Sequence, residues 1–419
     1  MIKSVMTLNV FVFKMYVLLC IPITIPILII IKLLEKIVII RFLEIQTNRI
    51  GHLSGQMELL FLQAKESQEK SSIRILDVYY PVGAVANKTL LSLWKRKVTL
   101  VSRYLAYPIA YICFKFLNSS HKCELICGDK DITHLLDKHP VSLILPEEMI
   151  IKGECCLNQH LKVPNGSKIV CLNMRDSAYY GVNSEDTSVT SYRNTNELVN
   201  FIEAIKYLIN KGFYVVRMGR KVEVKFPLKH DMFIDYANSN FSSDFMDIFL
   251  ANKCEFFIST QTGWDSVPYY SFRKYGAFVN SVPFFYLQTY REKVFYLTKR
   301  HISKETNKEL GLEGIFSHNV GYAFSTDEFS KNQIELKENS SKDILNIVID
   351  LHRFIDNDCK ENEFNMELQD KFREKFLQLS IRGSHRKRDD EYKNTPYHNE
   401  IRGYYAPTFL EDNSWWLES

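Results

Sequence analysis

Charged and hydroxyl side chains follow two apolar runs of this sequence, each where a buried strand is expected to end. The run 168–174 stops on Arg175 and Asp176. The run 254–258 leads into a turn rich in hydroxyl groups: Ser259, Thr260, Gln261, Thr262 and Gly263. In open α/β sheets the carboxyl ends of the strands form the edge where phosphate-bearing ligands bind. The pattern therefore predicts a nucleotide-type site, with Arg175 as its fixed positive charge.

Each of these two features also has a structural interpretation. A guanidinium at a strand end binds a diphosphate in bidentate fashion, and we expect Arg175 to face an opening at the sheet edge. Arg175 and Asp176 would otherwise form an ion pair that closes the loop. The hydroxyl-rich turn would cradle an anion with its backbone N–H groups, or else cap a helix through Thr262 or Asp265.

A third group of polar residues precedes the helix expected over 244–252. It consists of Asp235, Tyr236, Ser242, Ser243 and Asp244. Their acceptor atoms suit a ribose or the edge of a base. In the alternative interpretation, a serine caps the helix and Asp244 complements the helix dipole.

The candidate general base lies near the amino-terminal end of the sequence. His52 follows Gly51, and a histidine on the acceptor side of a cleft could remove the proton of an acceptor hydroxyl. Asp176 is the rival base. A lone histidine also occurs as a surface or capping residue, and this interpretation stays open.

The alternation of strand and helix patterns predicts an α/β protein with two Rossmann-like lobes. We expect an anchor and connector over 1–45, a first α/β lobe over 46–160, a second Rossmann-like lobe over 161–345, and C-terminal helices and a tail over 346–419. In the second lobe, strand 168–174, a helix capped by Asn194–Asn196 and strand 213–218 form one parallel unit. Residues 381–396 form a charged segment, and 404–417 is aromatic enough to dock on the body.

The amino-terminal stretch 15–31 carries no charge and lies between Lys14 and Lys32. Its length approaches that of a membrane-spanning helix, while Pro22 and Pro26 favour a bent or half-inserted anchor. It could also be a buried core helix or a cleaved signal peptide, although no small-residue cleavage site follows. Lys32, Lys36 and Arg41 on the downstream side favour a cytoplasmic body.

Composition excludes some classes of function. The 53 basic residues nearly balance 49 acidic ones, so the net charge of +4 gives no reason to expect nucleic acid as a partner. The nine cysteines include no CxxC pair and no zinc-type spacing. We therefore expect no metal, and we expect no cofactor.

An ordered set of short motifs resembles a family of bacterial glycosyltransferases found with surface-polysaccharide genes. The set comprises Arg49–Leu53, Arg175-Asp176, Tyr192–Asn194, Arg217–Gly219, Asp235-Tyr236, Asp244–Leu250, Phe257–Thr260 and Ala406–Leu410. More distantly, the second lobe is similar to the fucosyltransferase-like branch of the two-lobed GT-B enzymes. There a His-x-Arg segment grips the donor diphosphate, and this chain has Asn173 in place of the histidine.

By this resemblance the diphosphate role falls to Arg175 and the cradle role to Ser259, Thr260 and Thr262. Together with the residue patterns it predicts a membrane-associated hexosyl- or deoxyhexosyltransferase that moves a sugar from a nucleotide-sugar co-substrate to a glycan or lipid-linked acceptor in surface polysaccharide biosynthesis. Arg175, Asp176 and His52 would be catalytic, and Gly51 would lie on the acceptor side. The implied donor-binding residues are Arg193, Arg217, Gly219, Asp235, Tyr236, Ser242, Asp244, Ser259, Thr260, Thr262 and Gly263. The alternative is a membrane-tethered binding or scaffolding protein without turnover on the same fold.

Overall fold

The computed structural model describes residues 2–117, 119–125, 128, 130–176, 178, 189–357, 364–382 and 398–418. For 2–14, 119 and 381–382 the description covers the backbone only. Cys127, Cys359, most of the loop after Asp176 and most of the charged segment 381–396 lie outside the described residues. Contacts divide the chain into unit 1, Met1–Asp129, and unit 2, Lys130–Ser419.

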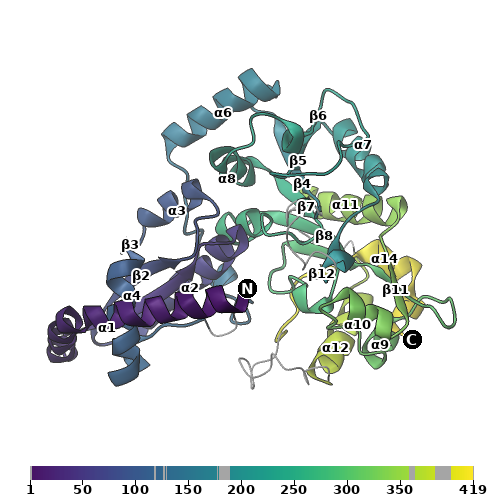
Figure 1. The fold of residues 1–419 in the computed structure, drawn as a ribbon. Helices are drawn as coiled ribbons and strands as arrows, with labels where there is room; N and C mark the ends of the chain where they lie inside the picture. The colour runs from purple at the N-terminus through teal and green to yellow at the C-terminus, as the bar shows by residue number, and fades with distance from the viewer. Residues whose placement is uncertain are drawn as a thin grey trace. The chain divides into compact units, whose positions relative to one another are not determined.

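Unit 1 is built on three parallel strands in the order β1-β2-β3 (Figure 1). Its elements are α1 (Ile2–Leu34), β1 (Val38–Gln46), the π-helix η1 (His52–Gln56), α2 (Met57–Lys70), β2 (Arg74–Val82), α3 (Lys88–Lys95), β3 (Thr99–Leu100), α4 (Arg103–Phe116) and η2 (Ser119–His121). Strand–helix–strand connections of this kind are typical of α/β sheets. The α/β class predicted from the sequence is confirmed.

The prediction of a connector directly after the apolar stretch is wrong, because strand β1 occupies this position. All nine of its residues pair in parallel with β2. Arg41, which we counted among the charges that orient the membrane anchor, is buried in unit 1. Its guanidinium donates to both carboxylate oxygens of Asp77, at 2.7 and 2.9 Å. A bidentate pair of this kind fixes the register of two strands, so Arg41 carries no information about topology.

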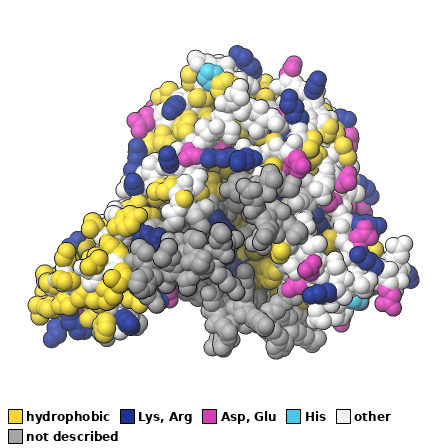
Figure 2. Space-filling model, in the orientation of Figure 1, with side chains coloured by type: hydrophobic (Ala, Val, Ile, Leu, Met, Phe, Trp, Pro, Cys, Tyr) yellow, Lys and Arg dark blue, Asp and Glu magenta, His cyan; other side chains and the backbone are white. Residues whose placement is uncertain are grey.

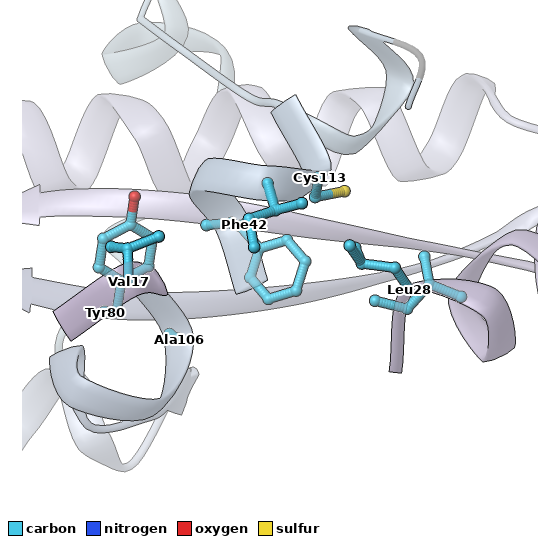
Figure 3. Packing of buried hydrophobic residues seen from close by; sticks show 9 residues of the cluster. Val17, Leu28, Phe42, Tyr80, Ala106 and Cys113 are labelled. Atoms are coloured by element: carbon cyan, nitrogen blue, oxygen red, sulfur yellow. The ribbon is translucent and has the colours of Figure 1, made fainter. Parts of the chain in front are cut away.

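Helix α1 packs along unit 1. Val17, Leu28 and Ile31 are buried against Phe42 of β1 and Tyr80 of β2, together with Ala106 and Cys113 of α4 (Figure 3). These α1 residues recur at helical spacing, so they lie on one face of the helix. The apolar stretch is therefore part of the hydrophobic core of unit 1 along one side.

Unit 2 contains a seven-stranded parallel sheet in the order β12-β9-β8-β7-β4-β5-β6. Its strands are β4 (Lys168–Asn173), β5 (Phe213–Met218), β6 (Phe233–Ile234), β7 (Phe256–Ser259), β8 (Tyr275–Ser281), β9 (Val294–Thr298) and β12 (Tyr404–Tyr405), while β10 (Arg300–Ser303) and β11 (Ile334–Lys337) form a separate antiparallel pair. The aromatic C-terminal segment docks as predicted, since β12 adds to β9 at the edge of the sheet.

The main helices of unit 2 are α5 (Leu135–Lys138), α6 (Glu147–Leu161), α7 (Ile202–Asn210), α8 (Asp244–Lys253), α9 (Leu312–Ser317), α10 (Thr326–Lys331), α11 (Ser341–Asp356), α12 (Met366–Arg382) and α14 (Pro407–Asp412). Shorter helical turns are η4 (Ser191–Arg193), η5 (Leu198–Phe201), η6 (Tyr236–Asn238), η7 (Val267–Ser271), η8 (Phe284–Tyr286) and η10 (Ser414–Leu417). Unit 2 begins thirty residues before the lobe boundary expected at 160, because α6 packs on α8.

The start of the first helix after β4 differs from the prediction. No side chain of Asn194–Asn196 caps it, and the segment begins as the short turn η5. The carboxylate of Glu338 instead accepts from the backbone N–H groups of Asn196 and Glu197, at 2.8 and 3.2 Å. A carboxylate from a distant part of the chain thus satisfies these donors. The end of α7 agrees with the sequence, since Gly212 has a φ of +85°.

Gly153 tests the packing of α6 on α8. A Cβ at Gly153 would lie 2.1 Å from the ring of Phe249, whereas a Cβ at Gly314 in α9 would meet nothing closer than 3.4 Å. Gly153→Ala should therefore destabilise the protein by about 1–3 kcal/mol, despite the better helix propensity of alanine. Gly314→Ala should be neutral or slightly stabilising. Chemical unfolding of both variants checks the pair, and equal midpoints would contradict the packing.

Candidate functional site

The site lies where the sheet of unit 2 changes its direction of growth. From β4 the chain adds β5 and β6 on one side, and it then returns to place β7, β8 and β9 on the other side. Segments that leave the carboxyl ends of β4 and β7 diverge at such a switch point and leave room for a ligand. Arg175 follows β4, and the turn 259–263 follows β7, so the topology brings together the two stretches singled out in the sequence.

Thr260 joins the ends of these two strands. Its backbone N–H donates to the carbonyl of Asn173 at 3.0 Å, and its hydroxyl accepts from the N–H of Arg175 at 2.7 Å. The carbonyl of Arg175 accepts in turn from the N–H of Thr195 at 3.1 Å. The backbone of Arg175 is therefore held on both sides.

The carboxylate of Asp265 organises the hydroxyl-rich turn. It accepts from the Ser259 hydroxyl and from the Thr262 N–H, each at 2.6 Å. Gln261 between them adopts a left-handed conformation with a φ of +60°. The Thr262 hydroxyl accepts from the Asn173 side chain and, at 3.2 Å, from the N–H of Trp264. The hydroxyls expected to cradle an anion thus build the turn itself, and the exposed part of the turn is Gly263.

Two guanidinium groups lie close to this turn. Arg175 and Arg193 both act on the Asp265 carboxyl, where they oppose the burial that raises its pKa to about 6. Arg193 donates to the carbonyl of Gln261 at 2.9 Å and lies over the ring of Tyr286, 4.4 Å from its centroid. Opposite charges favour the ionised carboxyl, while desolvation favours the neutral form, and desolvation is the larger effect here.

The exposure of the two arginines reverses the expected order of importance. The prediction that Arg175 faces an opening is wrong, because only 8% of it is exposed. Arg193 is half-buried. Its Nε and the Oε1 of Gln261 are among the buried side-chain atoms of the described residues for which no hydrogen bond is found. Buried polar atoms without partners in a protein normally meet water or a ligand. Arg193 is the better candidate for direct contact with an anion because it is the more exposed of the two arginines.

Contacts from distant strands hold the Arg193 segment in place. Lys299, directly after β9, donates to the carbonyl of Asn194 at 2.7 Å, and burial lowers the pKa of this lysine to about 8. Tyr192 packs against Phe329 of α10, with ring centroids 5.2 Å apart. Both neighbours of Arg193 in the chain are thus held in place, so the backbone from which its guanidinium extends has a defined position.

The remaining donor-side candidates form a second network beside β5, β6 and α8. Arg217 is buried, donates to the carbonyl of Val224 at 2.9 Å and lies 3.4 Å from Asp235. The Tyr236 hydroxyl donates to Asp247 at 2.9 Å and accepts from the N–H of Ser243 at 3.0 Å. These contacts are therefore between protein groups: Arg217 with Val224 and Asp235, and Tyr236 with Asp247 and Ser243.

Other members of the second network shape its loops. The Ser242 hydroxyl donates to the carbonyl of Gly219 at 3.5 Å, and Gly219 itself has a φ of +149°. Ser243 caps α8, as the alternative interpretation held. Asp244 and Asp247 both pair with Arg220. The indole of Trp264 donates to the carbonyl of Asp247 at 3.0 Å and thereby connects this network to the turn 259–263.

The two candidate bases have different surroundings. Asp176 accepts from the N–H groups of Ala178 at 2.8 Å and Glu223 at 3.0 Å, so its carboxylate ties together two loops of unit 2. His52 opens the π-helix η1 in unit 1, just past the carboxyl end of β1, and Gly51 precedes it with ordinary helical angles. Single-turn π-helices occur frequently at functional sites. Within the described part of the chain, no cluster of three or more metal-ligating side chains occurs.

Sequence reasoning missed several residues that build the site. Asp265 entered only as a possible cap, although its place three residues after Thr262 suits an acceptor for the N–H of that turn. Tyr286, Lys299 and Glu338 come from segments that no local pattern connects with Arg193. Their roles depend on tertiary contacts alone.

The buried carboxyl of Asp265 predicts a pH dependence of stability. Its pKa is 3.8 in a model compound and about 6 in the folded protein, so the folded state binds the proton more tightly. Stability from this group is therefore full below the unfolded pKa and is lost as the pH rises through about 6, by on the order of 3 kcal/mol. Asp265→Asn should remove this component. The difference in unfolding free energy between wild type and variant, measured from pH 4 to 7, should change with this sign, and a pH-independent difference would contradict it.

Comparisons with known proteins find weak structural similarities. No family model and no curated protein matches the sequence. A glycosyl transferase family 9 protein from Veillonella parvula aligns with a TM-score of 0.38 and 11% identity over 62% of this chain and 86% of that one. The iron-containing dodecameric glycosyltransferase TibC from enterotoxigenic Escherichia coli aligns with a TM-score of 0.33 and 13% identity over 59% of each chain. A TibC complex with ADP-D-beta-D-heptose gives 0.31 and 12%, over 58% of this chain and 59% of that one. These values assign the chain to no family, so the functional argument depends on the site itself.

Proposed function

We propose that this protein is a glycosyltransferase that takes a sugar from a nucleotide-sugar bound at the carboxyl edge of the unit 2 sheet. The observation that carries the proposal is the presence of Arg175 and Arg193 beside the turn 259–263 at the switch point of the sheet. Two guanidinium groups outnumber the one carboxyl, Asp265, that they share. An anion is therefore favoured here over a cation or a neutral ligand.

The chemistry follows from where negative charge develops. When an acceptor hydroxyl attacks the anomeric carbon, the sugar–phosphate bond breaks and the nucleoside diphosphate leaves with an additional negative charge. Arg193, the more exposed of the two cations, would contact this diphosphate, and the buried Arg175 would stabilise the same charge at longer range. A base must take the acceptor proton, and His52 and Asp176 remain the proposed candidates.

We further propose a glycan or lipid-linked acceptor, surface polysaccharide biosynthesis, a cytoplasmic catalytic body and transfer without a metal ion. The apolar helix α1 supports the lipid-linked acceptor, because an anchored enzyme and an anchored substrate share one plane. The part of α1 over Met15–Leu34 is long and apolar enough to cross a membrane. A non-catalytic binding protein, the alternative, would also bind the nucleotide-sugar, but it would not release free nucleotide from it.

Arg193→Gln tests the donor site. Loss of one charge-assisted contact to phosphate should weaken the binding of nucleoside diphosphates about ten- to a hundredfold. Arg353→Gln is the matched control, because Arg353 is exposed on α11 near Tyr207, at the end of α7 that leads to the amino end of β5. Isothermal titration with ADP, GDP and UDP measures the affinity, and undiminished binding by the Arg193 variant would defeat the assignment.

Turnover separates the enzyme from the binding protein. The wild-type protein, incubated with a panel of nucleotide-sugars and membrane lipid extract, should release the free nucleotide of one donor. Arg175→Gln should reduce this release more than it reduces nucleotide binding, because Arg175 is buried and acts on the leaving group at a distance. Binding without release of any nucleotide would favour the non-catalytic alternative.

A further inference from the structure

Helix α1 has two apolar faces with different surroundings. One face is buried in unit 1, as Figure 3 shows for Val17 and Leu28. The opposite face is equally apolar and exposed: Leu18, Leu19, Ile23, Ile25, Ile29, Ile30 and Leu33. Exposed apolar surface of this extent normally marks an interaction site.

Helix α4 continues this apolar surface. Its residues Tyr104, Leu105 and Phe116 are exposed, although Ala106 and Ala110 on its other face are buried against α1 and the sheet. A groove of about 1550 Å³ runs between the two helices and is lined by side chains from α1 and α4. Figure 2 shows hydrophobic side chains gathered over this end of unit 1, with Lys and Arg beside them.

The packing of α1 decides how it can meet a membrane. Its buried contacts run from Val17 to Ile31, which is about 21 Å of helix at 1.5 Å per residue. A helix that spans the bilayer perpendicular to its plane crosses the whole hydrocarbon layer, which is roughly 30 Å thick. If α1 spanned the bilayer, the parts of α4, β1 and β2 that pack on it would be drawn into the hydrocarbon. A helix that lies in the plane of the membrane, with its exposed face in the lipid, avoids this cost.

The charges at the groove indicate the kind of lipid. Its described lining includes three cations, Lys32, Arg103 and Lys115, and no acidic side chain. Lys32 also pairs with Glu35 outside the lining. An apolar groove with cations at its edge is complementary to a lipid whose chains are apolar and whose headgroup is a phosphate.

We propose that α1 and α4 together form a monotopic membrane-binding surface, and that the groove between them holds the chains of a phosphate-bearing lipid of the bilayer. Arg103 and Lys115 lie at opposite ends of α4 and face phosphates of the headgroup layer, while Leu105 and Phe116 enter the bilayer beside the exposed face of α1. This surface belongs to unit 1 alone and does not depend on sugar transfer. A catalytically inactive protein would bind lipid equally well.

Vesicle flotation of the full chain tests the surface. The wild-type protein should float with phosphatidylcholine vesicles and bind more tightly when half of the lipid is phosphatidylglycerol. Leu105→Glu with Phe116→Glu should reduce binding to both kinds of vesicle about tenfold or more, because a charge must enter the lipid. Ile150→Glu with Ile151→Glu on α6 is the control, since Leu105 and Ile151 are similarly exposed, at 65% and 63%. This control should bind as the wild type does.

A second pair of variants tests the headgroup. Arg103→Ala with Lys115→Ala should lower binding to the anionic vesicles about tenfold and leave binding to phosphatidylcholine nearly unchanged. Lys225→Ala with Lys229→Ala, two exposed cations of unit 2, removes the same charge elsewhere and should have little effect. Unfolding temperatures within a few degrees of the wild type confirm that the variants fold. Wild-type flotation by both α4 variants would mean that α1 alone is the anchor and would overturn the proposal, as would absence of flotation by the wild type.

Discussion

The switch point between β4 and β7 is the constraint on which the candidate site depends. The segments that follow these two neighbouring parallel strands leave the sheet in different directions. The backbone N–H and C=O groups beyond the strand ends therefore need hydrogen-bond partners outside the sheet. Thr260 supplies them, because its N–H bonds to Asn173 and its hydroxyl bonds to the N–H of Arg175. These contacts join the residues after β4 to the turn 259–263, and Thr195 and Asp265 add further support to each.

The electrostatics of the site follow from burying one carboxyl near two arginines. Asp265 holds the turn through Ser259 and Thr262; burial raises the pKa of its carboxyl, and these two hydrogen bonds, with Arg193 and Arg175 nearby, oppose that rise. The arginines in turn have a negative partner that prevents their charge from remaining uncompensated in the folded protein. An incoming diphosphate meets a site that is already arranged, so less ordering is needed on binding.

Unit 1 uses the hydrophobic effect in two ways along one helix. The face of α1 that contains Val17 and Leu28 completes the core over β1 and β2. The opposite face is largely exposed and leaves apolar area uncovered. The apolar residues that suggested a membrane span in the sequence therefore have two roles. Those on one face of α1 stabilise the fold of unit 1, and those on the other face are available for contact with lipid.

Local patterns in the sequence determined the strands and helices around the site. The apolar runs that became β4, β5 and β7 are short and bounded by polar turns, and Gly212 and Ser243 mark helix ends by their own chemistry. The order of the strands, and hence the meeting of Arg175 with Thr260, required the fold. So did strand β1, because its residues VIIRFLEIQ follow an apolar helix directly and the helical pattern concealed the change of period.

Exposure and partnership were decided by the tertiary structure alone. A sequence shows that Arg175, Arg193 and Arg217 are cations, but burial depends on segments far away in the chain. Asp235 forms an ion pair with Arg217. Lys299 and Glu338 form hydrogen bonds with the backbone beside Arg193. The Thr260 hydroxyl accepts from the backbone N–H of Arg175. The sequence thus determined which charges and hydroxyls exist at the sheet edge. Long-range packing determined which of them remain available to a ligand, because hydrogen bonds and ion pairs inside the protein use up the others.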